Sequence, residues 1–198
     1  MKFMQQVRGT LIPIGGNEDK GIAVNESYPL DFIDAGILYH VVKEAGGVNA
    51  NIVIIPTASS IPIEVGANYE EAFTTLGCEN ISILDIRSKE DSEKQSSIDL
   101  VKNADCVMFS GGNQSNITNK IGGTTIHEIL MDRYNNEEGF VIAGTSAGAM
   151  AMANEMISGR KPSEKTLERG QIVGFVIVMG LMVVIFGNDI WNLIKGNF

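Results

Sequence analysis

The chain has 198 residues, of which 44% are hydrophobic and 20% charged, a composition typical of a globular protein with one domain-sized core. Its 15 basic and 24 acidic residues give a formal net charge of −9. This excess of negative charge argues against nucleic acid as a partner, because no surplus of basic residues is there to neutralise phosphates.

Short apolar runs separated by helical patterns indicate five strands. The run NIVIIP is rich in β-branched residues and does not alternate with polar ones, as expected of a strand buried on both faces of a sheet. In chain order the expected strands are Thr10–Gly16, Asn51–Pro56, Ile81–Ile86, Asp105–Ser110 and Gly139–Ala143.

Apolar residues at helical spacing fill the intervals between these strands. Helices are expected over Asp31–Ala45, over Glu64–Leu76, in a segment ending near Ala104, and over Ile126–Tyr134. Thr125 and Glu128 form a Thr-x-x-Glu capping box that opens the last of them. The charged stretch Ser88–Ser97 is expected to be a solvated loop. Regular alternation of strand and helix predicts an α/β fold with a parallel sheet and right-handed crossovers.

A G-x-S-x-G motif, GTSAG, follows the fifth expected strand and leads into a helix of small residues. The flanking glycines allow a sharp turn that holds Ser146 in a strained conformation at the carboxyl edge of the sheet. The N–H group of Ala147 would then point at a carbonyl under attack. Ser146 is therefore a candidate nucleophile, and the alternative is a glycine-rich junction with a capping serine.

A second glycine turn, SGGNQ at residues 110–114, also follows a buried strand. The carboxyl ends of parallel strands meet at one edge of a sheet, so this turn can face Ser146. Its paired glycines could supply a second oxyanion donor, and Gln114 could bind a substrate amide; a plain turn is the alternative. The first glycine turn, GGNEDK at residues 15–20, carries charges that we interpret as surface residues.

Five sequence blocks, in matching order and spacing, resemble the cyanophycinase branch of the S51 serine peptidases. The blocks are IPIGGNEDK, IIPTAS, a stretch with Tyr69, Phe73 and LGC, FSGGNQ, and AGTSAGAMAM. The resemblance implies a class I glutamine amidotransferase-like fold, a flavodoxin-like three-layer sandwich, over residues 1–161. It also implies a serine peptidase that cleaves aspartyl peptides, as cyanophycinases do when they release β-aspartyl-arginine from cyanophycin.

The resemblance assigns roles to four residues of this sequence. Ser146 matches the family nucleophile, and Ala147 matches the next residue, whose N–H lines the oxyanion hole. Gly112 and Gln114 match the turn beside it, as a second oxyanion donor and a substrate-binding residue. No metal or organic cofactor is implied, and the expected partner is a peptide substrate, with a homodimer left open as the assembly.

The sequence departs from the family at the catalytic base. A serine nucleophile needs a base, almost always histidine, and the family takes it from a DTHF-like motif beyond the serine. No histidine follows Ser146 in these 198 residues. His40 and His127 lie upstream on expected helices and are interpreted as ordinary surface or core residues. Glu164 and Asp189 lie downstream, but neither belongs to a recognisable family block.

Residues 162–198 form an atypical tail in which Ile172–Gly187 has no polar side chain. The tail has three interpretations: the disrupted or truncated end of a family member, two buried strands joined at Gly180, or a membrane segment extended by Ile190–Ile194. The basic residues that precede it would place the domain in the cytoplasm in the membrane interpretation.

Two function hypotheses remain open. The first is a serine-type peptidase acting through Ser146. The second is a catalytically silent α/β domain that binds a small aspartyl or nucleotide-like ligand, tethered to a membrane by residues 172–194. Cys78 and Cys106 lack the close spacing of a metal or redox pair, and the N-terminal residues do not resemble a signal peptide, so a cytoplasmic location is expected.

Overall fold

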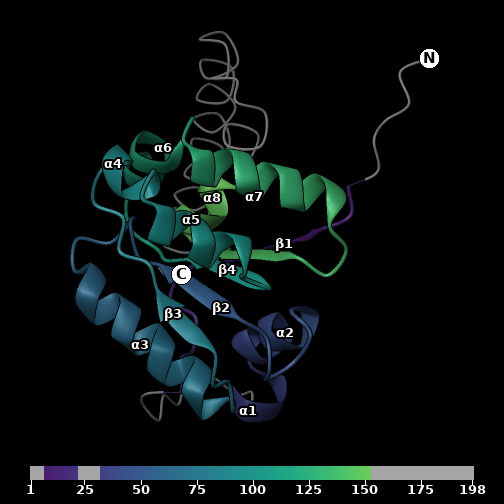
Figure 1. The fold of residues 1–198 in the computed structure, drawn as a ribbon. Helices are drawn as coiled ribbons and strands as arrows, with labels where there is room; N and C mark the ends of the chain where they lie inside the picture. The colour runs from purple at the N-terminus through teal and green to yellow at the C-terminus, as the bar shows by residue number, and fades with distance from the viewer. Residues whose placement is uncertain (1–6, 22–31, 153–198) are drawn as a thin grey trace, which may run out of the picture. The chain divides into compact units, whose positions relative to one another are not determined.

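The computed structural model describes residues 7–21 and 32–152, all within the unit Met1–Gly159. Within these residues five strands form one sheet in the order β1-β5-β4-β2-β3, and every pair of neighbours is parallel (Figure 1). The predicted α/β fold is therefore confirmed. The predicted boundary at residues 161 and 162 and the apolar tail lie outside the described residues. No helix in the described part of the chain is long and apolar enough to cross a membrane.

Each strand overlaps a predicted apolar run, but β3 ends three residues before the predicted end at Ile86, and β5 lies two residues further along the chain than the predicted Gly139–Ala143. The strands are β1 (Thr10–Ile14), β2 (Ile52–Ile55), β3 (Ile81–Ile83), β4 (Cys106–Phe109) and β5 (Val141–Thr145). All residues of β2, β4 and β5 are buried, as expected of inner strands of a parallel sheet. At the carboxyl edge, Thr145 of β5 is paired with Ile14 of β1, and Gly144 with Phe109 of β4. The end of β5 therefore lies between the ends of β1 and β4.

Helices cover both faces of the sheet and make a three-layer sandwich. They are α1 (Phe32–Ala35), α2 (Ile37–Glu44), α3 (Pro62–Thr75), α4 (Lys89–Ser92), α5 (Gln95–Lys102), α6 (Gln114–Ile121), α7 (Thr125–Asn136) and α8 (Ala147–Ala151). One core lies between the sheet and α5 to α8, and a second between the sheet and α2 and α3 (Figure 1). Successive residues of β2 alternate between them, with Val53 and Ile55 in the first core and Ile52 and Ile54 in the second.

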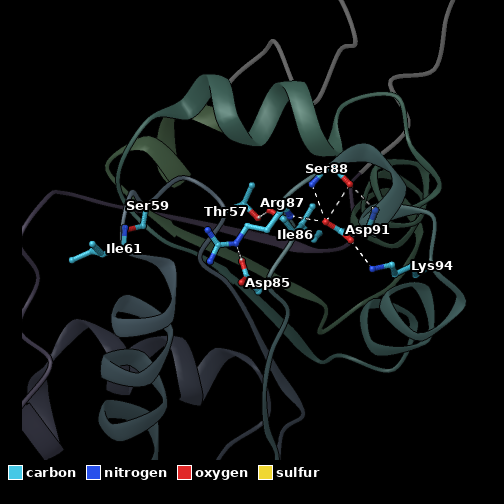
Figure 2. A network of polar contacts seen from close by, with 9 residues as sticks. All are labelled: Thr57, Ser59, Ile61, Asp85, Ile86, Arg87, Ser88, Asp91 and Lys94. Carbon is cyan, nitrogen blue, oxygen red and sulfur yellow. Dashed lines mark hydrogen bonds and ion pairs between the residues drawn. The ribbon is translucent and has the colours of Figure 1, made fainter.

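Two element predictions are wrong in detail. The helix predicted over Asp31–Ala45 is interrupted at Gly36, whose backbone is extended and which would place a Cβ 2.5 Å from the Phe32 carbonyl oxygen. The loop predicted over Ser88–Ser97 contains α4 and the start of α5. Ser88 and Asp91 form a capping box at the start of α4, which stabilises this short polar helix (Figure 2).

The capping box predicted at Thr125 and Glu128 is also wrong, by one residue. The N-cap of α7 is Thr124, whose hydroxyl accepts a hydrogen bond from the His127 N–H at 3.5 Å. Thr125 instead bonds a neighbouring segment: its N–H and its hydroxyl donate to the Glu93 carboxylate at 2.8 and 2.6 Å. The sequence alone does not reveal Glu93 as a partner, because it lies 32 residues upstream.

Candidate active site

Ser146 occupies a sharp turn between β5 and α8. Its φ of 49° and ψ of −105° are unusual for a residue with a side chain, and its side chain is exposed. The Ser146 N–H donates to the Ile14 carbonyl at 3.0 Å, and the Ser146 carbonyl accepts from the Met150 N–H at 2.8 Å. The strained residue is thus held by β1 on one side and by α8 on the other, the geometry of a nucleophile elbow.

The two glycines of the motif let α8 pack closely on the sheet. A Cβ on Gly144 would lie 2.7 Å from the Gly148 carbonyl carbon, and a Cβ on Gly148 would lie 2.5 Å from the Phe109 carbonyl oxygen. Real Cβ atoms do not approach backbone atoms so closely, so any larger residue would push the helix away from β4 and β5. The spacing of the G-x-S-x-G motif therefore follows from the close contact between strand and helix.

Glycine turns flank Ser146 on both sides. A Cβ on Gly16, in the turn after β1, would lie 3.8 Å from the Ser146 Cβ; one on Gly111, after β4, would lie 3.6 Å from it. Because β5 lies between β1 and β4, both turns reach the same edge of the sheet. The absence of side chains at these two positions leaves Ser146 accessible.

The turn after β4 is supported by the loop after β2. Gly112 has a φ of 139°, and a Cβ there would lie 2.1 Å from the Ala58 carbonyl oxygen, so only glycine fits. The same oxygen accepts a hydrogen bond from the Asn113 N–H at 2.8 Å. Thr57 fixes this loop by donating its hydroxyl to the Ile86 carbonyl at 3.1 Å (Figure 2).

A cleft of about 340 Å³ opens at this edge. It is lined by Gly16, Asn17, Glu18, Lys20, Val65, Asn68, Tyr69, Gly111, Gly112, Thr145 and Ser146. Of the predicted site residues, the structure thus brings Ser146 and Gly112 together, and buried Ala147 follows Ser146 directly. Gln114 is exposed at the start of α6 and does not line the cleft. A larger cavity, of about 490 Å³, lies at the amino ends of β2 and β3 and contains none of these residues.

A buried polar cluster borders the cleft, and no local sequence pattern predicts it. The Glu18 side chain, only 3% exposed, accepts a hydrogen bond from the Tyr69 hydroxyl and pairs with Lys20 at 2.7 Å. The Tyr69 hydroxyl is also hydrogen-bonded to the Thr145 hydroxyl at 3.0 Å. Burial, and then the negative charge of Glu18, raise the pKa of Tyr69, so its hydroxyl stays protonated. The interpretation of the GGNEDK turn as surface is therefore wrong for Glu18.

Neither histidine and neither cysteine reaches the cleft. His40 lies on α2, against Tyr39, and His127 on α7. Cys78 and Cys106 are buried free thiols, and burial raises the pKa of Cys106 to about 12, as expected of inert core residues. Among residues 7–21 and 32–152, no group of His, Cys, Asp and Glu side chains could hold a metal ion.

The fold and the site define an α/β protein with a nucleophile elbow of the kind that hydrolases use. The model of peptidase family S51 matches residues 35–178, and the chain belongs to this family.

Its relatives include two cyanophycinases. The chain is 31% identical to that of Trichormus variabilis over 180 residues, which cover 89% of this chain and 56% of the relative. It is 31% identical to the cyanophycinase of Geminocystis herdmanii over 160 residues, which cover 81% of this chain and 54% of the relative. The chain therefore spans about half the length of the curated relatives that it matches.

A solved structure supports the fold. The crystal structure of a peptidase from an acI-B1 Actinobacterium matches 78% of this chain and 60% of its own, with a TM-score of 0.57 and 23% sequence identity. At this level of identity the match concerns the arrangement of strands and helices.

Proposed function

We propose that this chain carries the nucleophile of a serine-type peptidase of the cyanophycinase type, which hydrolyses aspartyl peptides such as β-aspartyl-arginine. The observation that carries the proposal is the exposed Ser146, held in a strained elbow beside a cleft in a chain of family S51. The substrate class comes from the relatives, which are cyanophycinases.

In the proposed reaction the Ser146 Oγ bonds to the scissile carbonyl carbon and loses its proton to a base. The C–N bond then breaks, and the leaving amine takes up a proton. Negative charge develops on the carbonyl oxygen, and the N–H groups of Ala147 and Gly112 are the proposed donors that stabilise it. Gln114 would orient a substrate amide from the start of α6. The scheme uses no metal or organic cofactor.

The lack of a histidine base near Ser146 favours a second candidate function. Neither histidine of the chain lines the cleft, and none follows Ser146 in the sequence. The residue that normally accepts the serine proton is thus missing from these 198 residues. The second candidate is a catalytically silent domain that binds an aspartyl ligand in the cleft without turning it over.

Cleavage of β-aspartyl-arginine polymer by residues 1–198, measured beside Ser146→Ala, tests the proposal. Loss of a triad histidine lowers kcat by about 10⁶-fold, whereas the oxyanion hole and binding alone retain about 10³–10⁴-fold over water. We therefore expect marginal cleavage that Ser146→Ala removes.

Each outcome of this comparison decides between the candidates. Identical background rates in both proteins, together with measurable binding of the polymer, would favour the silent domain. Robust turnover that Ser146→Ala abolishes would mean that another group is the base, and His127→Gln and His40→Gln would then be the next variants to test.

A further inference from the structure

The polar cluster beside the cleft joins three elements around the elbow. Glu18 and Lys20 come from the turn after β1, Tyr69 from α3, and Thr145 from the last position of β5. The Lys20 ammonium group pairs with Glu18 at 2.7 Å and also lies 4.8 Å from the centre of the Tyr69 ring. The buried Glu18 carboxylate thus has two partners, one of which, Tyr69, is hydrogen-bonded to the last residue of β5, directly before Ser146.

Two structural connections lead from Glu18 to Ser146, one through side-chain hydrogen bonds and one through the backbone of the turn after β1. In the first, Glu18 bonds Tyr69, Tyr69 bonds Thr145, and Thr145 directly precedes Ser146. In the second, the turn that carries Glu18 also carries Gly16, next to Ser146. A shift of Glu18 would therefore move both the strand end and one wall of the cleft.

We infer that Glu18, Lys20 and Tyr69 are positioning residues that fix Ser146 in its strained conformation through Thr145. The inference rests on the proposed function of Ser146. A left-handed serine persists only where its surroundings over-determine it, and the two backbone bonds of Ser146 hold only its amide and carbonyl groups. The cluster holds Thr145, the residue before Ser146. It does so from the face of the sheet covered by α3, opposite to the face on which α8 packs, because Tyr69 belongs to the core between the sheet and α3.

The ring and the hydroxyl of Tyr69 have separate roles. The ring is buried and stacks on Phe73 with centroids 6.4 Å apart, and a phenylalanine would keep that contact. The hydroxyl connects Glu18 to Thr145, and a phenylalanine would remove this connection while leaving the Glu18–Lys20 pair intact. Tyr69→Phe therefore tests positioning with little change in packing.

Amide hydrogen exchange at the elbow is the decisive measurement. Tyr69→Phe, and Thr145→Val, which keeps the shape of threonine, should each accelerate exchange of the Ser146 and Met150 amides by about two- to tenfold, the effect of losing one hydrogen bond. Thr145→Ser keeps the hydroxyl and should restore slow exchange. Tyr134→Phe, on α7, is the matched control and should change nothing at the elbow.

The pattern of exchange separates positioning from general stability. Acceleration confined to the elbow, with the amide of Val141 at the start of β5 unchanged, would support the inference. No acceleration, or the same acceleration at the elbow and at Val141, would overturn it, because the hydroxyl would then act on overall stability alone.

A second readout separates this inference from the proposed function. A fluorophosphonate forms a bond between its phosphorus and the Oγ of an activated serine, with release of fluoride and of the serine proton. Mass spectrometry should find slow labelling of Ser146, slowed further by Tyr69→Phe and by Thr145→Val. If the unmodified chain is not labelled, the proposed activity fails, while the exchange pattern still decides whether the cluster positions the elbow.

Discussion

Gly112 shows how closely the edge of the sheet is fitted around Ser146. Its φ of 139° lies where a side chain is strained, and the Ala58 carbonyl oxygen fills the space in which a Cβ would stand. Gly139 also has a positive φ, 85°, but nothing lies within 4 Å of a Cβ placed there. Substitutions at these two glycines therefore separate the cost of backbone strain from the cost of steric overlap.

Gly112→Ala is expected to lower the free energy of unfolding by about 2–4 kcal/mol, because strain and overlap add. Gly139→Ala introduces backbone strain without steric overlap, so it should lower the free energy of unfolding by only about 1–2 kcal/mol. Urea unfolding followed by circular dichroism measures both variants. Equal losses would show that the loop after β2 yields to the new methyl group, and that the turn is less rigid than the structure indicates.

Access to Ser146 depends on the missing side chain of Gly111. An alanine methyl group there would lie in ordinary contact with the Ser146 Cβ, at 3.6 Å, whereas the branches of a valine would extend over the hydroxyl. Gly111→Val should therefore slow fluorophosphonate labelling of Ser146 by about tenfold or more, the scale of a misplaced reacting group. Gly111→Ala should label almost normally. Similar rates for the two variants would mean that the reagent reaches Ser146 from another side.

At the residue scale the sequence predicts the elbow but not its support. GTSAG after a buried strand is a local pattern, because strand, turn and helix follow one another along the chain. The sequence does not reveal that Glu18 is buried, because its partners lie far along the chain: Tyr69 is 51 residues downstream, and Tyr69 in turn is hydrogen-bonded to Thr145, 76 residues further on. A buried carboxylate at the end of β1 can be recognised only once the topology places that end beside β5.

The short helix α4 is stabilised by charged side chains. It has four residues, and the Asp91 carboxylate accepts hydrogen bonds from the Arg87 and Ser88 N–H groups and from the Lys94 ammonium group, the last at 2.6 Å (Figure 2). The hydrogen bond from Lys94, followed by that from the Arg87 backbone, lowers the pKa of Asp91 to about 2.

The low pKa of Asp91 predicts the direction of an acid dependence. The ordinary pKa of 3.8 is above the folded value, so this carboxylate stabilises the fold fully above about pH 4, and the contribution is lost as the pH falls through about 2. Asp91→Asn should therefore flatten the acid limb of a plot of stability against pH, and Lys94→Met should flatten it in part. Parallel acid limbs for the unmodified chain and Asp91→Asn would contradict this.

At the element scale periodicity finds most helices and strands, and local backbone geometry decides where they end. The apolar pattern through residues 32–42 continues across Gly36, so the pattern cannot reveal the break that the extended glycine makes. The polar composition of Ser88–Ser97 conceals α4, because hydrogen bonds to caps stabilise that helix more than burial does. β3 ends at Ile83, although the apolar run continues to Ile86.

The two cores share the sheet, so the described domain should unfold as one unit. Leu38 of α2 and Ile121 of α6 are fully buried on opposite faces. Leu38→Ala and Ile121→Ala should each lower the free energy of unfolding by about 2–5 kcal/mol. In both variants, circular dichroism and the exchange of amides in both helix layers should report the same midpoint. Earlier opening of the mutated layer alone would show two separable cores.

The position of β5 has a consequence for the order in which the chain folds. Within the described sheet β1 pairs only with β5, and Thr10 finds its partner Val141 about 130 residues later in synthesis. Until β5 leaves the ribosome, β1 has no neighbour in the sheet and β4 presents an open edge, a surface that favours association with other chains. The insertion of β5 gives β1 and β4 a shared neighbour and brings Ser146 to the sheet edge in the same step, so a nascent chain presents the proposed nucleophile only after these described strands are joined.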